Sequence, residues 1–124
     1  MRLWRIEAWK NNPLDAQREV LQDLVTSAQY TEFGRKYNFS NLFNVRDFKT
    51  AVPISNYDDM KFYIERIMHG EQNILWNTPI YWFAKSSGTT SDKSKFIPVS
   101  DESLQDCHFK ASKDVLSLYY LFNP

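Results

Sequence analysis

The chain has 124 residues, a length that fits one domain or a piece of one. Its 15 lysines and arginines equal its 15 aspartates and glutamates. This balance argues against a general nucleic-acid binder, which needs clustered positive charge facing phosphates. Apolar residues make up 43% of the chain and aromatic residues 16%, which excludes a disordered tail. No apolar run approaches the roughly 18 residues that cross a bilayer, so no membrane partner is expected.

The single cysteine, Cys107, excludes an internal disulfide and is too few for a zinc site. Arg2, Arg5 and Glu7 interrupt the N-terminal apolar residues, so the sequence predicts no secretory signal there. These features favour a cytoplasmic protein.

The first elements in chain order are helices. Apolar residues at helical spacing predict a helix from about Pro13 to about Ala28, and proline suits the first turn of a helix. A short helix is expected over residues 45–51. Pro53 then disfavours helical backbone at the residue before it and ends that helix.

The clearest helical pattern covers residues 56–69. Ser55 followed by Asp58 resembles a capping box, with aspartate in place of the usual glutamate. Apolar residues recur on one face behind it, and Gly70 supplies a left-handed stop. We expect His69, in the last turn, to interact with the helix C-terminus rather than to catalyse a reaction.

The pattern then changes to strands. Residues 80–84 are five apolar residues in a row and predict a strand buried on both faces. A polar loop follows over 85–94, and residues 95–99 predict a second strand, which Pro98 places at an edge or near its end. Ser100 is expected to cap a final helix. The apolar face of that helix comprises Leu104, Cys107, His108, Ala111, Val115, Leu118 and Tyr119.

This order of elements predicts an α+β or α/β fold class, helical over residues 1–70 and strand–loop–strand–helix over 71–124. The chain stops at Phe122, Asn123 and Pro124, directly after the apolar residues 118–121, whereas domains more often finish on a polar tail or a docked element. We therefore expect residues 1–124 to be a single partial domain, the N-terminal piece of a longer one.

The polar loop carries the clearest chemistry. Residues 85–95 read Lys-Ser-Ser-Gly-Thr-Thr-Ser-Asp-Lys-Ser-Lys. Hydroxyls and backbone amides donate hydrogen bonds to anions, Gly88 permits a close approach, and lysines add positive charge. Gly88 stands alone, so the loop is neither a Walker A motif nor a dinucleotide fingerprint.

A turn without function is the plain alternative, because turns favour serine, threonine and glycine for conformational reasons. Two features favour a phosphate loop instead. The loop is longer than most hairpin turns, and it follows the most apolar strand, as nucleotide loops do at the carboxyl ends of strands in open sheets.

The loop resembles the phosphate loop of the adenylate-forming enzymes. Residues 86–90, Ser-Ser-Gly-Thr-Thr, match the core of that motif, and Lys95 matches its lysine. Ser91 and Ser94 replace a glycine and a proline. These departures resemble one branch, the auxin-responsive promoter family of acyl acid amido synthetases, which carries Ser-Ser-Gly-Thr-Thr-Ser, then Lys, then Ile-Pro.

Flanking segments are similar to the same family, in the same order, from about Asp15 to Ser100. These segments are Thr31-Glu32-Phe33-Gly34, Val52-Pro53-Ile54 with Tyr57, residues 63–67, Gly70-Glu71 and Ile74-Leu75-Trp76.

The resemblance implies the N-terminal fragment of an ATP-dependent acyl acid amido synthetase. Such an enzyme uses ATP and Mg2+ to adenylate a carboxylic acid and then transfers the acyl group to an amine, usually that of an amino acid. The adenine pocket, metal ligands and acyl pocket would lie beyond this chain, so the resemblance implies no catalytic or metal-ligating residue within it and a fragment that is inactive alone. The implied phosphate-binding residues are Ser86, Ser87, Gly88, Thr89, Thr90, Ser91 and Lys95, with Lys93 a weaker candidate.

Other interpretations stay open. A small helical interaction module, whose Ser/Thr loop is only a structural turn, is the main alternative, and a stop codon after Pro124 in the gene would favour it. An anion or phosphopeptide binder is disfavoured because the loop holds no arginine. A fragment is expected to self-associate, since two strands rarely make a stable sheet and apolar surface would stay exposed.

The remaining conspicuous residues have structural interpretations. Cys107 is expected to be buried, and His108 to lie in the core or line a pocket. Asp58 and Asp59 are expected to serve the helix dipole rather than a metal. The tryptophans are expected to be core or interface anchors. They are Trp4, Trp9, Trp76 and Trp82.

Overall fold

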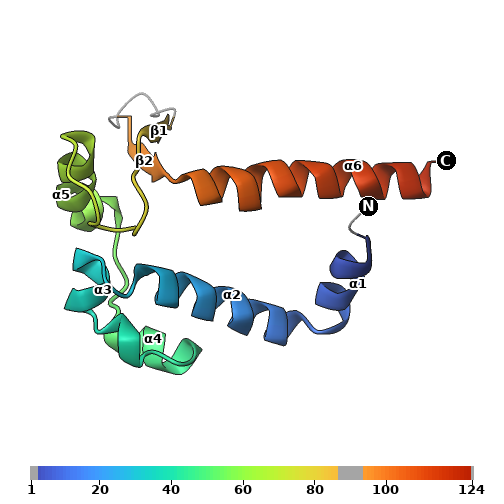
Figure 1. The fold of residues 1–124 in the computed structure, drawn as a ribbon, viewed down its shortest axis with the longest axis horizontal. Coiled ribbons are helices and arrows are strands. Elements are labelled where there is room, and N and C mark those ends of the chain that lie inside the picture. Colours follow the sequence, from blue (N-terminus) through green and yellow to red (C-terminus); the bar gives the residue numbers. More distant parts are fainter. Residues whose placement is uncertain (1–2, 87–93, 124) are drawn as a thin grey trace.

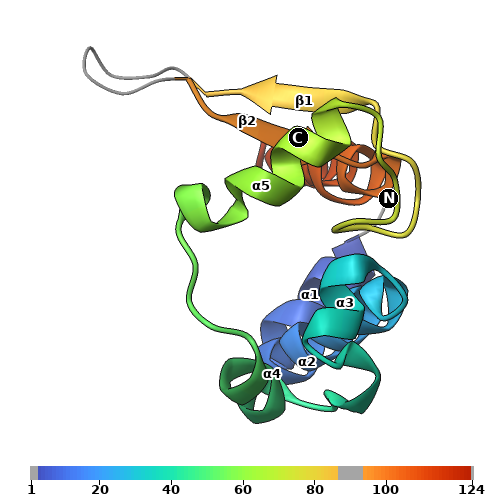
Figure 2. The same ribbon diagram turned by 90° about the vertical axis from the view of Figure 1, so that its left-hand side faces the viewer.

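The computed structural model describes residues 3–86 and 94–123, which form two layers (Figures 1 and 2). The first layer holds α1 (Leu3–Asn11), α2 (Pro13–Ala28), α3 (Glu32–Lys36), the short 3-10 helix η1 (Phe39–Asn41) and α4 (Val45–Ala51). The second holds α5 (Tyr57–Met68), strands β1 (Trp82–Lys85) and β2 (Phe96–Val99), and a final helix. That helix has a π-helical part, η2 (Ser103–Phe109), and continues as α6 (Lys110–Phe122), which contacts α1.

The helices over 13–28 and 45–51 are confirmed at their predicted bounds, and the helix over 56–69 is confirmed with its ends one residue inside. The sequence pattern does not predict α1 and α3 as separate helices. Every described side chain of α1 is partly or fully exposed, so its apolar residues mark no single face. Helix α3 has five residues, too few to show a helical period.

The capping box of α5 lies one residue later than expected. Asn56, not Ser55, is the N-cap, and its side-chain oxygen accepts from the backbone N–H groups of Asp58 and Asp59 at 2.8 and 3.2 Å. The Asp59 carboxylate accepts from the Asn56 N–H at 2.8 Å. The Ser55 hydroxyl instead donates to the Pro53 carbonyl, and asparagine is at least as good an N-cap as serine.

The sheet is a two-stranded antiparallel ladder, which decides the fold class as α+β rather than α/β. Trp82 pairs with Val99 and Lys85 with Phe96. The expectation of a strand buried on both faces over 80–84 is wrong: Ile80 is buried ahead of the strand, but Trp82 is 65% exposed. Only one face of the hairpin packs on a core, and Phe83 is the β1 side chain that reaches it.

The core consists of two clusters, one in each layer. Val25, Ala28, Phe39 and Leu42 form the first, and Tyr63, Ile67, Ile74 and Ile80 form the second. Phe33 packs against both clusters, with its ring centroid 6.0 Å from that of Phe39 and 5.6 Å from that of Tyr63. Trp76 also packs against both, which confirms a core position for it, whereas Trp4 and Trp82 are 72% and 65% exposed and lie outside the core.

A buried turn leads from α2 into α3. The Thr31 hydroxyl donates to the Ala28 carbonyl at 2.7 Å and accepts from the Gly34 N–H at 3.0 Å, so it caps α3 while fully buried. A side chain at Gly34 would place its first carbon 2.0 Å from the Ala28 oxygen, so only glycine fits. The segment Thr31-Glu32-Phe33-Gly34 therefore has a structural role in this chain.

Arg66 of α5 joins three segments. Its guanidinium bonds both carboxylate oxygens of Glu32 at 2.7 and 2.8 Å and reaches Glu71 at 2.7 Å. Hydrogen bonds from Arg66 hold the pKa values of Glu32 and Glu71 below their usual range. Arg66 therefore ties α3 to α5 and to the segment that leaves α5.

Glu102 joins the segment before β1 to the final helix. Its carboxylate accepts from the Trp76 indole N–H at 3.2 Å and from the Thr78 hydroxyl at 3.0 Å. Burial works to raise the pKa of Glu102, but the hydrogen bonds that it accepts outweigh burial and lower it. Ser100 caps this helix as expected, accepting from the Ser103 N–H at 3.1 Å.

We expect Thr31→Val to lower the free energy of unfolding by about 1–3 kcal/mol, because it leaves the buried Gly34 N–H without a partner. Thr50→Val is the matched control, since the Thr50 hydroxyl bonds only its own exposed helix. Its effect should stay within about 0.5 kcal/mol. Urea unfolding of both variants measures the difference, and equal effects would show that the Thr31 cap contributes nothing specific.

Arg66→Met should remove an acid-dependent part of the stability. The pKa values of Glu32 and Glu71 are lowered from 4.5 in the folded chain, so the stability from these pairs is present above pH 4.5 and is lost as the pH falls through the lower folded values. Thermal melting between about pH 6 and pH 3 should fall more steeply in the wild type than in the variant. Arg18→Met, which breaks the exposed pair with Asp15, is the control and should leave the slope unchanged.

Candidate functional site

The base of the polar loop is held together by Ser86 and Lys95. These residues continue the ladder of β1 and β2 by one pair, because the Ser86 N–H donates to the Lys95 carbonyl at 2.9 Å. In return the Lys95 N–H donates to the Ser86 side-chain oxygen at 3.2 Å. Ser86 thus closes the loop with its hydroxyl oxygen and keeps its hydroxyl proton available for another acceptor.

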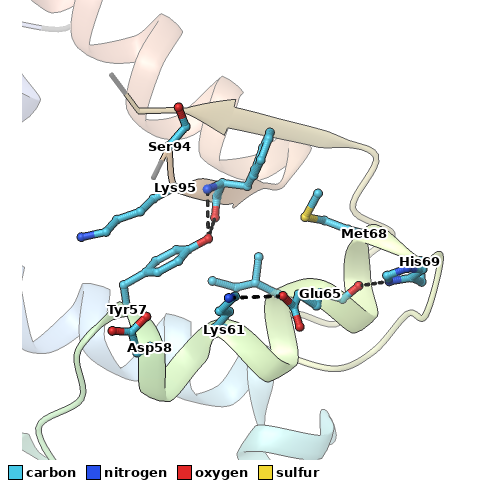
Figure 3. A pocket seen from close by; sticks show the side chains of 10 residues that line it. Tyr57, Asp58, Lys61, Glu65, Met68, His69, Ser94 and Lys95 are labelled. Atoms are coloured by element: carbon cyan, nitrogen blue, oxygen red, sulfur yellow. Dashed lines mark hydrogen bonds and ion pairs between the residues drawn. The ribbon is translucent and has the colours of Figure 1, made fainter. Parts of the chain in front are cut away.

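Tyr57, the first residue of α5, holds the other edge of β2. The Phe96 N–H donates to the Tyr57 hydroxyl oxygen at 3.0 Å, and the same hydroxyl donates to the Phe96 carbonyl at a longer 3.3 Å (Figure 3). The Lys95 ammonium lies 5.6 Å from the centroid of the Tyr57 ring. One phenol therefore contacts both the strand that follows the loop and the lysine at its base.

A cavity of about 600 Å³ lies between α5 and the start of β2 (Figure 3). Its wall includes the apolar side chains of Ile64 and Met68 and the charged side chain of Lys95, the residue before β2. Lys61 pairs with Glu65 at 3.7 Å across one turn of the helix. The ring Nδ1 of His69 lies 2.7 Å from the Glu65 carbonyl oxygen, so this histidine is tied to the C-terminus of α5, as expected.

The structure brings together two of the seven expected phosphate-binding residues, Ser86 and Lys95. Both are half-buried, and opposed residues of an antiparallel pair project from the same face of the hairpin. Ser94 is half-buried and lines the cavity beside them. The other five expected residues and Lys93 lie outside the described residues. These five are Ser87, Gly88, Thr89, Thr90 and Ser91.

The expected order of two strands on either side of the polar segment is confirmed by β1 and β2. These strands are antiparallel neighbours, whereas nucleotide loops in open sheets lead from a strand into a helix. Sequence reasoning missed the contact of Tyr57 with Phe96. The sequence placed Tyr57 on the apolar stripe of α5, and nothing in that spacing signals a partner 39 residues later.

The residues at the loop base suit an anionic group. A lysine ammonium and a serine hydroxyl on one face provide a charge and a donor, which are the groups that bind phosphate oxygens. Among residues 3–86 and 94–123, no group of three or more histidine, cysteine or acidic residues is placed to hold a metal ion.

Cys107 and His108 on the final helix are exposed, whereas the sequence predicts a buried Cys107 and a core or pocket position for His108. Cys107 is an exposed free thiol that lines a second cavity, of about 480 Å³, between α2, the segment before β1 and η2. His108 is also exposed, with its ring centroid 5.5 Å from that of Phe109. The helix face that holds them lies largely against solvent in this chain. No helix among the described residues is long and apolar enough to cross a membrane.

Residues 2–122 match the family model described as "GH3 family N-terminal domain". The indole-3-acetic acid-amido synthetase GH3.2 of Arabidopsis thaliana is 34% identical over 100 residues, which cover 80% of this chain and 18% of that protein. The jasmonoyl-L-amino acid synthetase JAR6 of Nicotiana attenuata is 34% identical over 104 residues, which cover 81% and 18%.

A solved structure of the GH3.15 acyl acid amido synthetase resembles the fold of this chain, with a TM-score of 0.74 and 30% identity. The match covers 84% of this chain and 19% of that structure. The chain thus spans about one fifth of the length of the relatives that it matches. The resemblance inferred from the loop and its flanks is confirmed, and the chain belongs to the GH3 family of acyl acid amido synthetases.

Proposed function

We propose that residues 1–124 are the N-terminal part of an ATP-dependent acyl acid amido synthetase, a single partial domain of a longer adenylating enzyme. The observation that supports this most strongly is the family match over residues 2–122, together with relatives that are amido synthetases. Because the chain spans about a fifth of those relatives, we assign the activity to the whole protein and expect residues 1–124 alone to be inactive. We also propose that the enzyme acts in the cytoplasm.

The role that we propose for this chain is to hold the phosphates of ATP. Lys95 supplies positive charge and Ser86 a hydroxyl donor, and both are fixed at the base of the loop by the hydrogen bonds between them. The loop residues beyond the described part would add hydroxyl and amide donors. The proposed set is Ser86, Ser87, Gly88, Thr89, Thr90, Ser91 and Lys95.

The chemistry explains why such a loop is useful. A carboxylate is a poor electrophile, whereas its mixed anhydride with AMP reacts readily with an amine. Holding the β- and γ-phosphates keeps the α-phosphorus facing the carboxylate and stabilises charge on the departing pyrophosphate. In this proposal the Mg2+ ligands, the adenine pocket and the acyl pocket come from the rest of the protein.

We propose a carboxylic acid and an amino acid as the substrates of the whole protein. The printed names of the relatives support this class, since they are indole-3-acetic acid-amido and jasmonoyl-amino acid synthetases. A solved structure of the related GH3.15 enzyme is a complex with 2,4-DB. The particular acid and amine depend on residues beyond this chain.

The full-length protein should catalyse carboxylate-dependent exchange of pyrophosphate into ATP. Replacing Thr89 and Thr90 by valine keeps their shape and removes two donors. Each donor lost to a charged group should cost about 1.5–3 kcal/mol, or roughly tenfold to a hundredfold in exchange rate. Thr50→Val, on the exposed side of α4, is the matched control and should leave the rate unchanged.

Exchange that stays at the wild-type rate in the Thr89/Thr90 double variant would show that the loop does not hold phosphates. A full-length gene that ends at Pro124 would instead support a small helical interaction module with a structural Ser/Thr turn. Reading the open reading frame beyond Pro124 is therefore the first measurement to make.

The 124-residue chain by itself should self-associate. The sheet of its described residues has two strands, and large apolar side chains such as Leu116, Tyr120 and Phe122 of α6 are at least half exposed. Exposed apolar surface and open strand edges favour pairing between chains. Sedimentation at micromolar concentration should show a dimer or larger species with weak ATP binding at best, and a monomer that binds ATP tightly would contradict the fragment interpretation.

A further inference from the structure

We propose that Tyr57 is a positioning residue for Lys95, and that its hydroxyl sets where the lysine at the loop base lies. This inference rests on the proposed phosphate-binding function. It concerns a residue on a helix outside the loop, 38 positions earlier in the chain. Tyr57 itself need not touch ATP, because it acts through the backbone and the side chain of β2.

The backbone around Lys95 is held from two sides. On one side the Lys95 carbonyl and N–H bond Ser86, at 2.9 and 3.2 Å. On the other side the next residue, Phe96, offers its N–H to the Tyr57 hydroxyl at 3.0 Å. In an antiparallel pair, alternate residues turn their N–H and C=O groups away from the partner strand. Without Tyr57, those of Phe96 would face outward, where no other strand of residues 3–86 and 94–123 meets them.

Tyr57 is itself well fixed. It follows the N-cap Asn56, whose capping box with Asp59 holds the first turn of α5, and a capped first turn frays less than an open one. The ring is half-buried and lies in the wall of the cavity between α5 and β2 (Figure 3). The phenol therefore fixes the start of β2, and with it the preceding Lys95, relative to the helix α5.

The ring adds a second restraint on the lysine. The Lys95 ammonium lies 5.6 Å from its centroid, within the range in which a cation is attracted to an aromatic face. Removing the hydroxyl but keeping the ring separates these two contributions. The two core clusters are centred on other buried residues, so loss of the Tyr57 hydroxyl should affect the hairpin before it affects the core.

The test uses the full-length protein that contains this chain and measures carboxylate-dependent ATP–pyrophosphate exchange. Tyr57→Phe should raise the KM for ATP by roughly three- to tenfold and leave the KM for the carboxylic acid unchanged. Tyr63→Phe is the matched control on the same helix. The Tyr63 hydroxyl accepts from the Lys36 ammonium at 2.8 Å, away from the hairpin, so its loss should affect stability without changing the KM for ATP.

A second comparison asks whether Tyr57 acts through Lys95. Lys95→Met should raise the KM for ATP, and adding Tyr57→Phe to it should then change that KM by less than about twofold, because coupled residues are not additive. Circular dichroism and melting temperatures verify that all variants fold, and both phenylalanine variants keep the ring that packs. A general loss of folding would instead lower the exchange rate at saturating ATP and carboxylic acid, without a selective rise in the KM for ATP.

The inference is overturned if Tyr57→Phe has the same KM for ATP as Tyr63→Phe, or if the effects of Tyr57→Phe and Lys95→Met simply multiply. In those cases exchange by the wild type still supports the proposed function. A wild-type protein without any carboxylate-dependent exchange overturns the proposed function, and the role of Tyr57 with it.

Discussion

Helix α3 has five residues and would not persist alone, yet both layers are bonded to it. Its first N–H groups donate to the Asn73 and Ile74 carbonyls at 3.0 Å, where a helix normally needs a cap or water. Phe33 contacts the cores of both layers, and Glu32 bonds Arg66. All of this depends on the close approach at Gly34, which lets α3 follow α2 directly.

That joint fixes α5, and α5 in turn fixes the hairpin. Tyr63 in the middle of α5 and Arg66 near its end both bond residues of α3. Tyr57 at the start of α5 bonds β2. The same helix therefore contacts α3 with its middle and end and the base of the loop with its start.

Much of this arrangement follows from local sequence. The helices over 13–28 and 45–51 and the stop at Gly70, which has a φ of 95°, are set by residues within or beside each element. The capping box lies one residue later than the sequence predicts, because serine and asparagine are both good N-cap residues. The sequence predicts a strand buried on both faces over 80–84, but β1 at 82–85 is mostly exposed, because a run of apolar residues does not reveal how many layers cover it.

The sequence indicates the composition of the candidate site but not its geometry. The residue types of the loop and its flanks were enough to infer the family, and the family match agrees with that resemblance. The pairing of Tyr57 with Phe96 joins residues 39 positions apart, and no periodicity encodes such a contact. The π-helical stretch over 103–109 was likewise invisible, since its apolar spacing is that of an ordinary helix.

The outer edge of β2 has a consequence for how the sheet can grow. Ladder alternation turns Phe96 and Pro98 outward from β1. The Phe96 N–H is bonded to a phenol and Pro98 has no N–H, so neither residue offers a free N–H to an incoming strand. This edge therefore discourages the addition of a strand by the rest of a longer protein or by another copy, and β1 is the edge at which the small sheet extends more readily.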